Sequence, residues 1–132
     1  MNQERFTFKK DEILSKRDDI NRLFKESSSF TIYPFKVLYR SYPSENDSNL
    51  QAGFSIPKRL YKKAVDRNLL KRRCKEAYRR NKNDLKQTLT ENHSALHLLL
   101  IYIAKEPQEY SQIEQKIILT LQRLQLIYAE DT

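Results

Sequence analysis

The side chains of this chain that could do chemistry are mostly cations, and they are gathered in one stretch. Between Lys62 and Lys82 there are ten basic residues and two acidic ones, a net charge of +8. The whole chain of 132 residues also has a formal net charge of +8, so the residues outside this stretch sum to zero. A short segment that holds the entire charge excess of a protein indicates a site for a polyanion, and nucleic acid is the polyanion we expect.

Other reactive residue types are few and scattered. His93 and His97 are the only histidines, and His97 lies in a strand-like run, where a spacing of four does not bring two rings together. The single cysteine, Cys74, excludes a disulfide within the chain and adds too little for a zinc site. There is no acidic cluster of the two-metal nuclease kind and no glycine-rich phosphate loop. We therefore expect no catalytic residue, no metal site and no reaction catalysed by this chain alone.

The basic stretch is predicted to be a helix with two different faces. It contains neither Gly nor Pro, and good helix formers dominate it. One narrow face carries Leu70, Cys74, Ala77 and Tyr78, which is the spacing of a buried stripe. A second face carries Arg67, Asn68, Lys71, Arg72, Lys75, Arg79 and Lys82, with Arg73 and Arg80 lying off it. A merely solvated helix interleaves Glu with Lys, and this one hardly does, so nucleic-acid binding is favoured.

The residues in and before this helix resemble the signature of the protein subunit of bacterial ribonuclease P. In this sequence the signature reads Lys58-Arg59, then Lys62-Lys63-Ala64-Val65-Asp66-Arg67-Asn68-Leu69-Leu70-Lys71-Arg72. The preceding Gly53-Phe54-Ser55-Ile56 is similar to the glycine-containing strand that comes before the signature in that family. The resemblance is strong from Gly53 to Arg80 and looser towards both termini.

The resemblance implies a function that composition and spacing do not. In the family the catalyst is an RNA subunit with bound Mg²⁺, and the protein holds the 5′ leader of precursor tRNA beside it. The partners implied are the catalytic RNA and precursor tRNA, with no membrane and no obligate protein partner. Carried over by position, the contacts to the catalytic RNA are Lys62, Lys63, Arg67, Asn68, Lys71, Arg72, Lys75 and Arg79. The contacts to the leader are Ile20, Phe24, Tyr39, Lys58 and Arg59, and Ile20 stands where the family often has Phe.

The elements that must position these side chains form one α+β domain spanning residues 1–132. Asp11 can cap a first helix that runs through Phe24. Strands are predicted at 30–42 and 50–57, paired as an antiparallel hairpin, with an extra short strand near Thr31. Gly53 lies inside the second of these strands, and we expect the basic helix to pack over it.

The C-terminal half supplies a strand and a helix. Residues 95–104 are nearly all apolar, as in a strand buried on both faces at the centre of a sheet. Residues 110–128 carry apolar side chains at spacings of three and four, which predicts an amphipathic covering helix. Residues 81–92 are predicted to be a frayed helix end and a polar connector, and residues 1–10 to be extended.

The predicted order is therefore α-β-β-α-β-α, a small α-β sandwich in which the basic helix crosses over a mixed sheet. The resemblance adds that this helix links two parallel strands with an unusual left-handed sense.

Two other functions stay open from the residues. A ribosomal-protein-like structural RNA-binding domain would have much the same surface, because a basic helix does not fix function; the RNA that co-purifies distinguishes the two. A helix-turn-helix DNA-binding protein would need a partner helix ahead of the basic helix, where strand-like residues stand instead. No apolar run is long enough to span a membrane and no secretory segment is present, so we expect a cytoplasmic protein.

Overall fold

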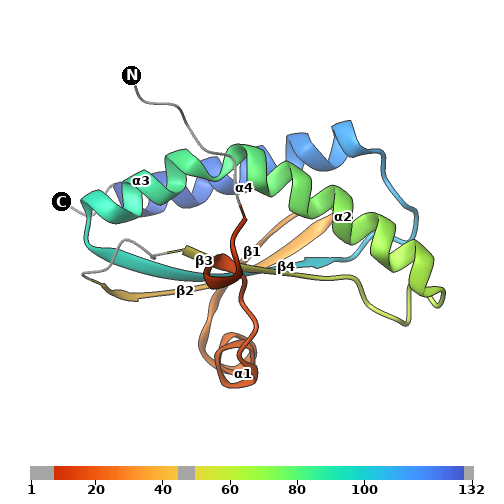
Figure 1. Ribbon diagram of the computed structural model, residues 1–132, viewed down its shortest axis with the longest axis horizontal. Coiled ribbons are helices and arrows are strands. Elements are labelled where there is room, and N and C mark those ends of the chain that lie inside the picture. The colour runs from red at the N-terminus through yellow and green to blue at the C-terminus, as the bar shows by residue number, and fades with distance from the viewer. Residues whose placement is uncertain (1–7, 45–49, 130–132) are drawn as a thin grey trace.

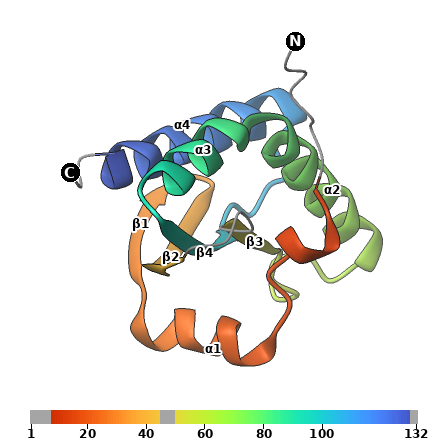
Figure 2. The same ribbon diagram turned by 60° about the vertical axis from the view of Figure 1, so that its left-hand side comes forward.

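The computed structural model describes residues 8–44 and 50–129, and a four-stranded sheet forms its middle layer (Figure 1). The strands are β1 (Ser28–Ile32), β2 (Phe35–Pro43), β3 (Leu50–Ser55) and β4 (Ser94–Tyr102). Three α-helices cover one face: α2 (Ala64–Asn81), α3 (Asn83–Glu91) and α4 (Tyr110–Ala129). Figure 2 shows α1 (Arg17–Glu26) on the opposite face, preceded by the 3-10 turn η1 (Lys10–Glu12). The predicted α+β class, the mixed sheet and the short extra strand, β1, are confirmed. The extended conformation predicted for residues 1–7 lies outside the described residues.

The sheet has the order β1-β2-β4-β3, so the predicted hairpin between the strands at 30–42 and 50–57 is wrong. β4 lies between β2 and β3, antiparallel to the former and parallel to the latter. Its side chains are largely buried on both faces. A central position leaves the least apolar surface of such a strand exposed to water. The hairpin is instead formed by β1 and β2. Parallel neighbouring strands need a crossover connection, and α2 and α3 provide it between β3 and β4, as the resemblance implies. The left-handed sense of this crossover stays a prediction.

The first helix begins at Arg17 and not after Asp11, which corrects the predicted start. Ile13 forms a bridge with Ala52, and the backbone N–H of Leu14 donates to the carbonyl of Ala52 at 2.9 Å. The segment before α1 is therefore extended along the free edge of β3, because its apolar side chains gain more from the sheet than from an isolated helical turn.

The single glycine of the chain, Gly53, has close neighbours on its side of the sheet. A Cβ atom on Gly53 would lie 3.3 Å from Leu99 Cδ1, a tight contact, and 3.5 Å from the carbonyl oxygen of Leu14. The close neighbours of Gly53 are thus Leu99 of β4 and the extended segment at Leu14, and not the basic helix that the sequence led us to expect.

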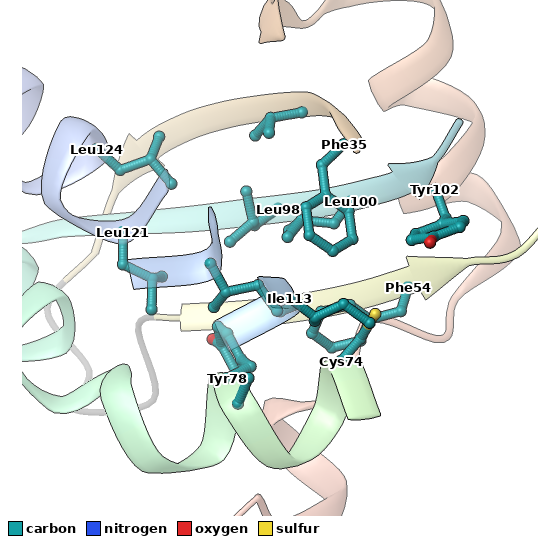
Figure 3. Close-up of a cluster of buried hydrophobic side chains, with 14 of the residues drawn as sticks. Phe35, Phe54, Cys74, Tyr78, Leu98, Leu100, Tyr102, Ile113, Leu121 and Leu124 are labelled. Atoms are coloured by element: carbon teal, nitrogen blue, oxygen red, sulfur yellow. The ribbon is translucent and has the colours of Figure 1, made fainter. Parts of the chain in front are cut away.

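The main core lies between the sheet and helices α2, α3 and α4 (Figure 3). The predicted stripe of α2, Leu70, Cys74, Ala77 and Tyr78, is fully buried there. Residues 83–91 form the helix α3 and bury Leu85 and Leu89, so the predicted polar connector is wrong. The signal for this helix was the spacing of four between the two leucines, which places both on one helical face.

A smaller apolar cluster joins α1 to the other face of the sheet. It consists of Leu14, Leu23, Leu38 and Leu99, with Ile20 and Ile101 half-buried against it. α1 therefore lies across the strands with Leu23 turned towards the sheet, and its two flanks border different parts of the same face.

Candidate RNA interface

The predicted contacts to the catalytic RNA lie together on α2 and on the loop before it. Lys62, Lys63, Asn68, Arg72 and Lys75 are exposed, and Arg67, Lys71 and Arg79 are half-buried. The opposite side of α2 is fixed in the core, so the helix cannot rotate about its axis. The result is an oriented row of cations, the arrangement that neutralises successive phosphates of a nucleic acid.

Two of these arginines also have contacts within the protein. Arg67 Nη1 donates to the carbonyl oxygens of Tyr61 at 2.8 Å and Lys62 at 2.9 Å, which holds the loop that leads into α2. Arg79 forms a bidentate pair with Glu76, with Nε to Oε1 at 2.8 Å and Nη2 to Oε2 at 2.9 Å. Arg67 therefore shapes the surface as well as charging it, and the charge of Arg79 is offset by its neighbour.

Two further cations, Arg73 and Lys82, point away from the exposed row. Arg73 Nη1 donates to the carbonyl of Gln108 at 2.6 Å, which points it towards the start of α4, in agreement with its predicted place off the second face of the helix. Lys82 was predicted to lie on that second face, but it is buried in an ion pair with Glu12, and this prediction is wrong. Its position at the junction of α2 and α3 turns it inwards.

An open hollow of about 410 Å³ borders the cationic row. Leu69 and Tyr110 give it apolar walls, and Arg72 and Arg73 place guanidinium groups beside them. Planar cations and aromatic faces are the groups on which unstacked RNA bases pack, so the surface offers more than phosphate contacts.

The predicted leader contacts on α1 lie on the other face of the sheet. Phe24 is 61% exposed, so its ring is accessible at the surface, and Ile20 lies one turn before it, half-buried near Ile101. Lys58 and Arg59 are exposed in the turn that follows β3.

Tyr39 does not join Phe24, because it lies on the opposite face of the sheet. Its ring packs against Phe30, with centroids 5.6 Å apart, and against Tyr128 of α4 at 6.5 Å. The alternation of β2 requires this, since Tyr39 shares a face with the buried Phe35 and Val37. The structure therefore does not bring Tyr39 and Phe24 together in one cleft, and a leader contact by Tyr39 stays a prediction.

The same alternation places residues that the sequence reasoning missed on the α1 side. Arg40 and Tyr42 follow Leu38 on that face of β2, and His97 lies beside Arg40 on β4. The signal was present in the period of two along the strand, which separates Arg40 and Tyr42 from Tyr39.

The buried cysteine has no chemistry to offer at neutral pH. Burial raises the pKa of the Cys74 thiol to about 12, so the thiolate, which is the nucleophilic form, is scarcely populated. Cys74 packs in the core, as its place on the apolar stripe of α2 predicts.

A layered α+β fold with an oriented cationic helix on one side and an exposed aromatic residue on the other defines a class of small nucleic-acid-binding proteins. Within the described residues, no helix has the length and apolar character needed to cross a membrane.

Comparison with known proteins narrows this class to a family. Residues 8–125 match the family model described as Ribonuclease P. The Ribonuclease P protein component of Porphyromonas gingivalis is 31% identical over 119 residues, which are 90% of this chain and 87% of that protein. The chain belongs to the ribonuclease P protein family.

Solved structures agree. The RNase P protein from Thermotoga maritima has a TM-score of 0.67 and 26% identity, over 85% of this chain and 96% of that one. The Staphylococcus aureus RNase P protein shares the fold with a TM-score of 0.64 at 21% identity, over 86% and 96% of the two chains. The role of this chain is thus that of the protein component of ribonuclease P, a part of an endoribonuclease, and a ribosomal-protein-like role is not favoured.

Proposed function

We propose that this protein assists a catalytic RNA in removing the 5′ leader from precursor tRNA, and that the hydrolysis itself is carried out by the RNA. The observation that carries the proposal is the two-sided α2, with Leu70, Cys74, Ala77 and Tyr78 buried while cations of the opposite side stay at the surface. Such a helix binds a folded RNA in one orientation, and counterion release makes the affinity depend on salt.

The leader is proposed to bind on the other face of the sheet, along the side of α1 that carries Phe24. An exposed aromatic ring can stack on an unpaired base, and the exposed Lys58 and Arg59 can pair with the leader backbone. Mature tRNA has no leader, so these contacts favour precursor over product. The protein would then bind catalytic RNA with one layer and substrate with the other.

Magnesium is expected with the RNA subunit. Among residues 8–44 and 50–129, no three His, Cys, Asp or Glu side chains come together as a possible set of metal ligands. Carboxylate-rich sets are what Mg²⁺ prefers in proteins, so the described residues do not fit a protein-borne site, and no step is assigned to one.

Reconstitution tests the proposal. The purified protein, the cognate catalytic RNA and the two together are each incubated with precursor tRNA and Mg²⁺. We expect the protein alone to leave the precursor intact, and the complex to bind precursor more tightly than mature tRNA. Cleavage at the mature 5′ end by the protein without RNA would contradict the proposal, as would a complex that binds precursor and mature tRNA equally.

A further inference from the structure

α1 leaves a second groove on the sheet, on the side away from Phe24. Leu23 packs over Leu38 and Leu99, while Ile20 packs near Ile101, two residues further along β4. Phe24 follows Ile20 by one turn and so shares its flank of α1, whereas Asp19 and Arg22 lie on the other flank. That other flank borders a cavity of about 530 Å³ that is not part of the surface assigned to the leader above.

The floor of this second groove is a row of side chains from three adjacent strands. Arg40 of β2, His97 of β4 and Gln51 of β3 are direct partners in the sheet register, so their side chains lie next to one another on the α1 face. Tyr42 stands two residues beyond Arg40 on the same face of β2. Arg22 and Lys16, the N-cap residue of α1, form the opposite wall.

The groove combines positive charge with an aromatic surface. Its lining includes three cations, Lys16, Arg22 and Arg40, against one carboxylate, Asp19, and the carboxylate of Glu26 comes within 3.8 Å of Arg40 at the margin. The excess of positive charge attracts a phosphate. Lys16 and Arg22 are exposed, so a phosphate can reach them.

The aromatic surface is fixed in place. Tyr42 Oη and His97 Nε2 are hydrogen-bonded at 2.5 Å, and the two rings meet edge to face with centroids 4.8 Å apart. Burial lowers the pKa of His97, so the ring is neutral near pH 7 and keeps this hydrogen bond. Tyr42 is still 39% exposed, which leaves its ring accessible to a base.

We propose that this second groove binds a nucleotide of single-stranded RNA, with its phosphate at Arg22 and Arg40 and its base on Tyr42. The strand is the part of the precursor leader that lies further from the cleavage site than the part at Phe24, an assignment that rests on the proposed function. The groove is lined by residues of α1 and of the sheet strands beneath it, whereas α2 lies on the opposite face of the sheet (Figure 2). An α-helix with its side chains is about 10–12 Å wide. A leader RNA bound at Phe24 has only to pass over this width of α1 to enter the groove.

A series of leader lengths tests this assignment. Precursor tRNAs whose leaders are shortened one nucleotide at a time from the 5′ end are titrated against the reconstituted complex, and Kd is measured for each. For the wild-type protein, affinity should rise as the leader reaches the groove. Tyr42→Ala and Arg22→Ala should each abolish that last gain, about tenfold for a lost base–aromatic stack, and leave short leaders unaffected. Lys116→Ala, which removes a cation from α4 on the opposite face of the sheet (Figure 2), is the matched control and should keep the wild-type gain with long leaders.

Three other outcomes overturn the assignment. Equal weakening at every leader length would place Tyr42 in the same subsite as Phe24. Unchanged affinities in both variants would mean that the groove does not contact RNA. A loss of affinity for the catalytic RNA in the absence of substrate would assign the groove to that RNA.

Two further variants keep the result interpretable. Tyr42→Phe retains the stacking surface and should retain the long-leader gain, and the thermal midpoint of each variant reports whether the fold is intact. Phe24→Ala should weaken binding of short and long leaders alike. If it weakens neither, the leader surface proposed for α1 fails independently of the second groove.

Discussion

The carboxylate of Glu12 and the ammonium of Lys82 form a buried ion pair between residues that are 70 positions apart. Only 4% of Glu12 and 1% of Lys82 are exposed. The backbone N–H of Lys9 donates to the same carboxylate at 3.1 Å, and Lys86 Nζ lies 3.7 Å from it. Burial opposes ionisation of Glu12, but the hydrogen bonds from Lys82 and Lys9 and the nearby positive charges lower its pKa overall. The pair ties η1 to the junction of α2 and α3.

Breaking this pair should destabilise the fold. Glu12→Gln leaves Lys82 as a buried charge without a counterion, and we expect the free energy of unfolding to fall by about 3–5 kcal/mol. Lys86→Gln is the control, since Lys86 is about one-third exposed and more distant; its cost should be about 1 kcal/mol or less. Chemical denaturation of both variants measures the difference, and equal costs would show that the buried pair has no special weight.

Truncation of Tyr39 should affect stability and not substrate choice. Its ring packs against Phe30 and Tyr128, so Tyr39→Ala should lower the free energy of unfolding, by less than the about 3–5 kcal/mol lost at a fully buried aromatic residue. The preference of the reconstituted complex for precursor over mature tRNA should stay unchanged. Thermal midpoints and a pair of Kd values on this variant test both statements. A reduced preference with an unaltered midpoint would return Tyr39 to the leader site.

The cations of α2 should contribute unequally to assembly. Arg72 is exposed, whereas the guanidinium of Arg79 is bound by the carboxylate of Glu76. Arg72→Ala should therefore weaken binding to the catalytic RNA and reduce the slope of log K against log salt by about 1. Arg79→Ala should do less, and Glu76→Ala should strengthen binding by releasing Arg79. Binding isotherms at several salt concentrations supply the slopes, and identical slopes for both arginine variants would show that α2 acts as a diffuse charge.

The half-buried His97 of the second groove should make stability depend on pH. Burial lowers the pKa of His97 from its ordinary value of 6.5, so below that value the unfolded chain takes up a proton that the folded chain does not. The contribution of His97 to the free energy of unfolding is therefore fully present above pH 6.5, and it is lost as the pH falls from 6.5 towards the pKa of the folded state. His97→Gln should remove this slope, as measured by denaturation between about pH 8 and about pH 5. The contribution of Glu12 is lost only at lower pH, below its ordinary 4.5, so the two effects are separable. A variant with the wild-type slope would exclude His97 as its source.

Local pattern alone determined the elements whose burial follows a simple period. The stripe Leu70, Cys74, Ala77 and Tyr78 fixed which side of α2 faces inwards, and the apolar run of β4 fixed its central place. Both predictions succeed because the side-chain periods of helix and strand convert spacing directly into a face. The cationic surface follows from the same period, since the residues opposite a buried stripe turn away from the core that the stripe contacts. The signature around Arg67 and Asn68 then identified the family.

Only the tertiary structure decided which strands pair and which side chains meet. Adjacent strands in the sequence suggested a hairpin, but pairing β4 with both β2 and β3 buries more apolar surface, and the sequence period says nothing about neighbours. The start of α1 depended on the edge of β3, which accepts Ile13 and Leu14 as an extended segment. Lys82 looked like one more surface cation because its partner, Glu12, lies 70 residues away. The second groove likewise exists because the sheet register sets Arg40 beside His97 while α1 packs on the neighbouring Leu38 and Leu99. Contacts of this kind are set by the packing of layers, and no local spacing encodes them.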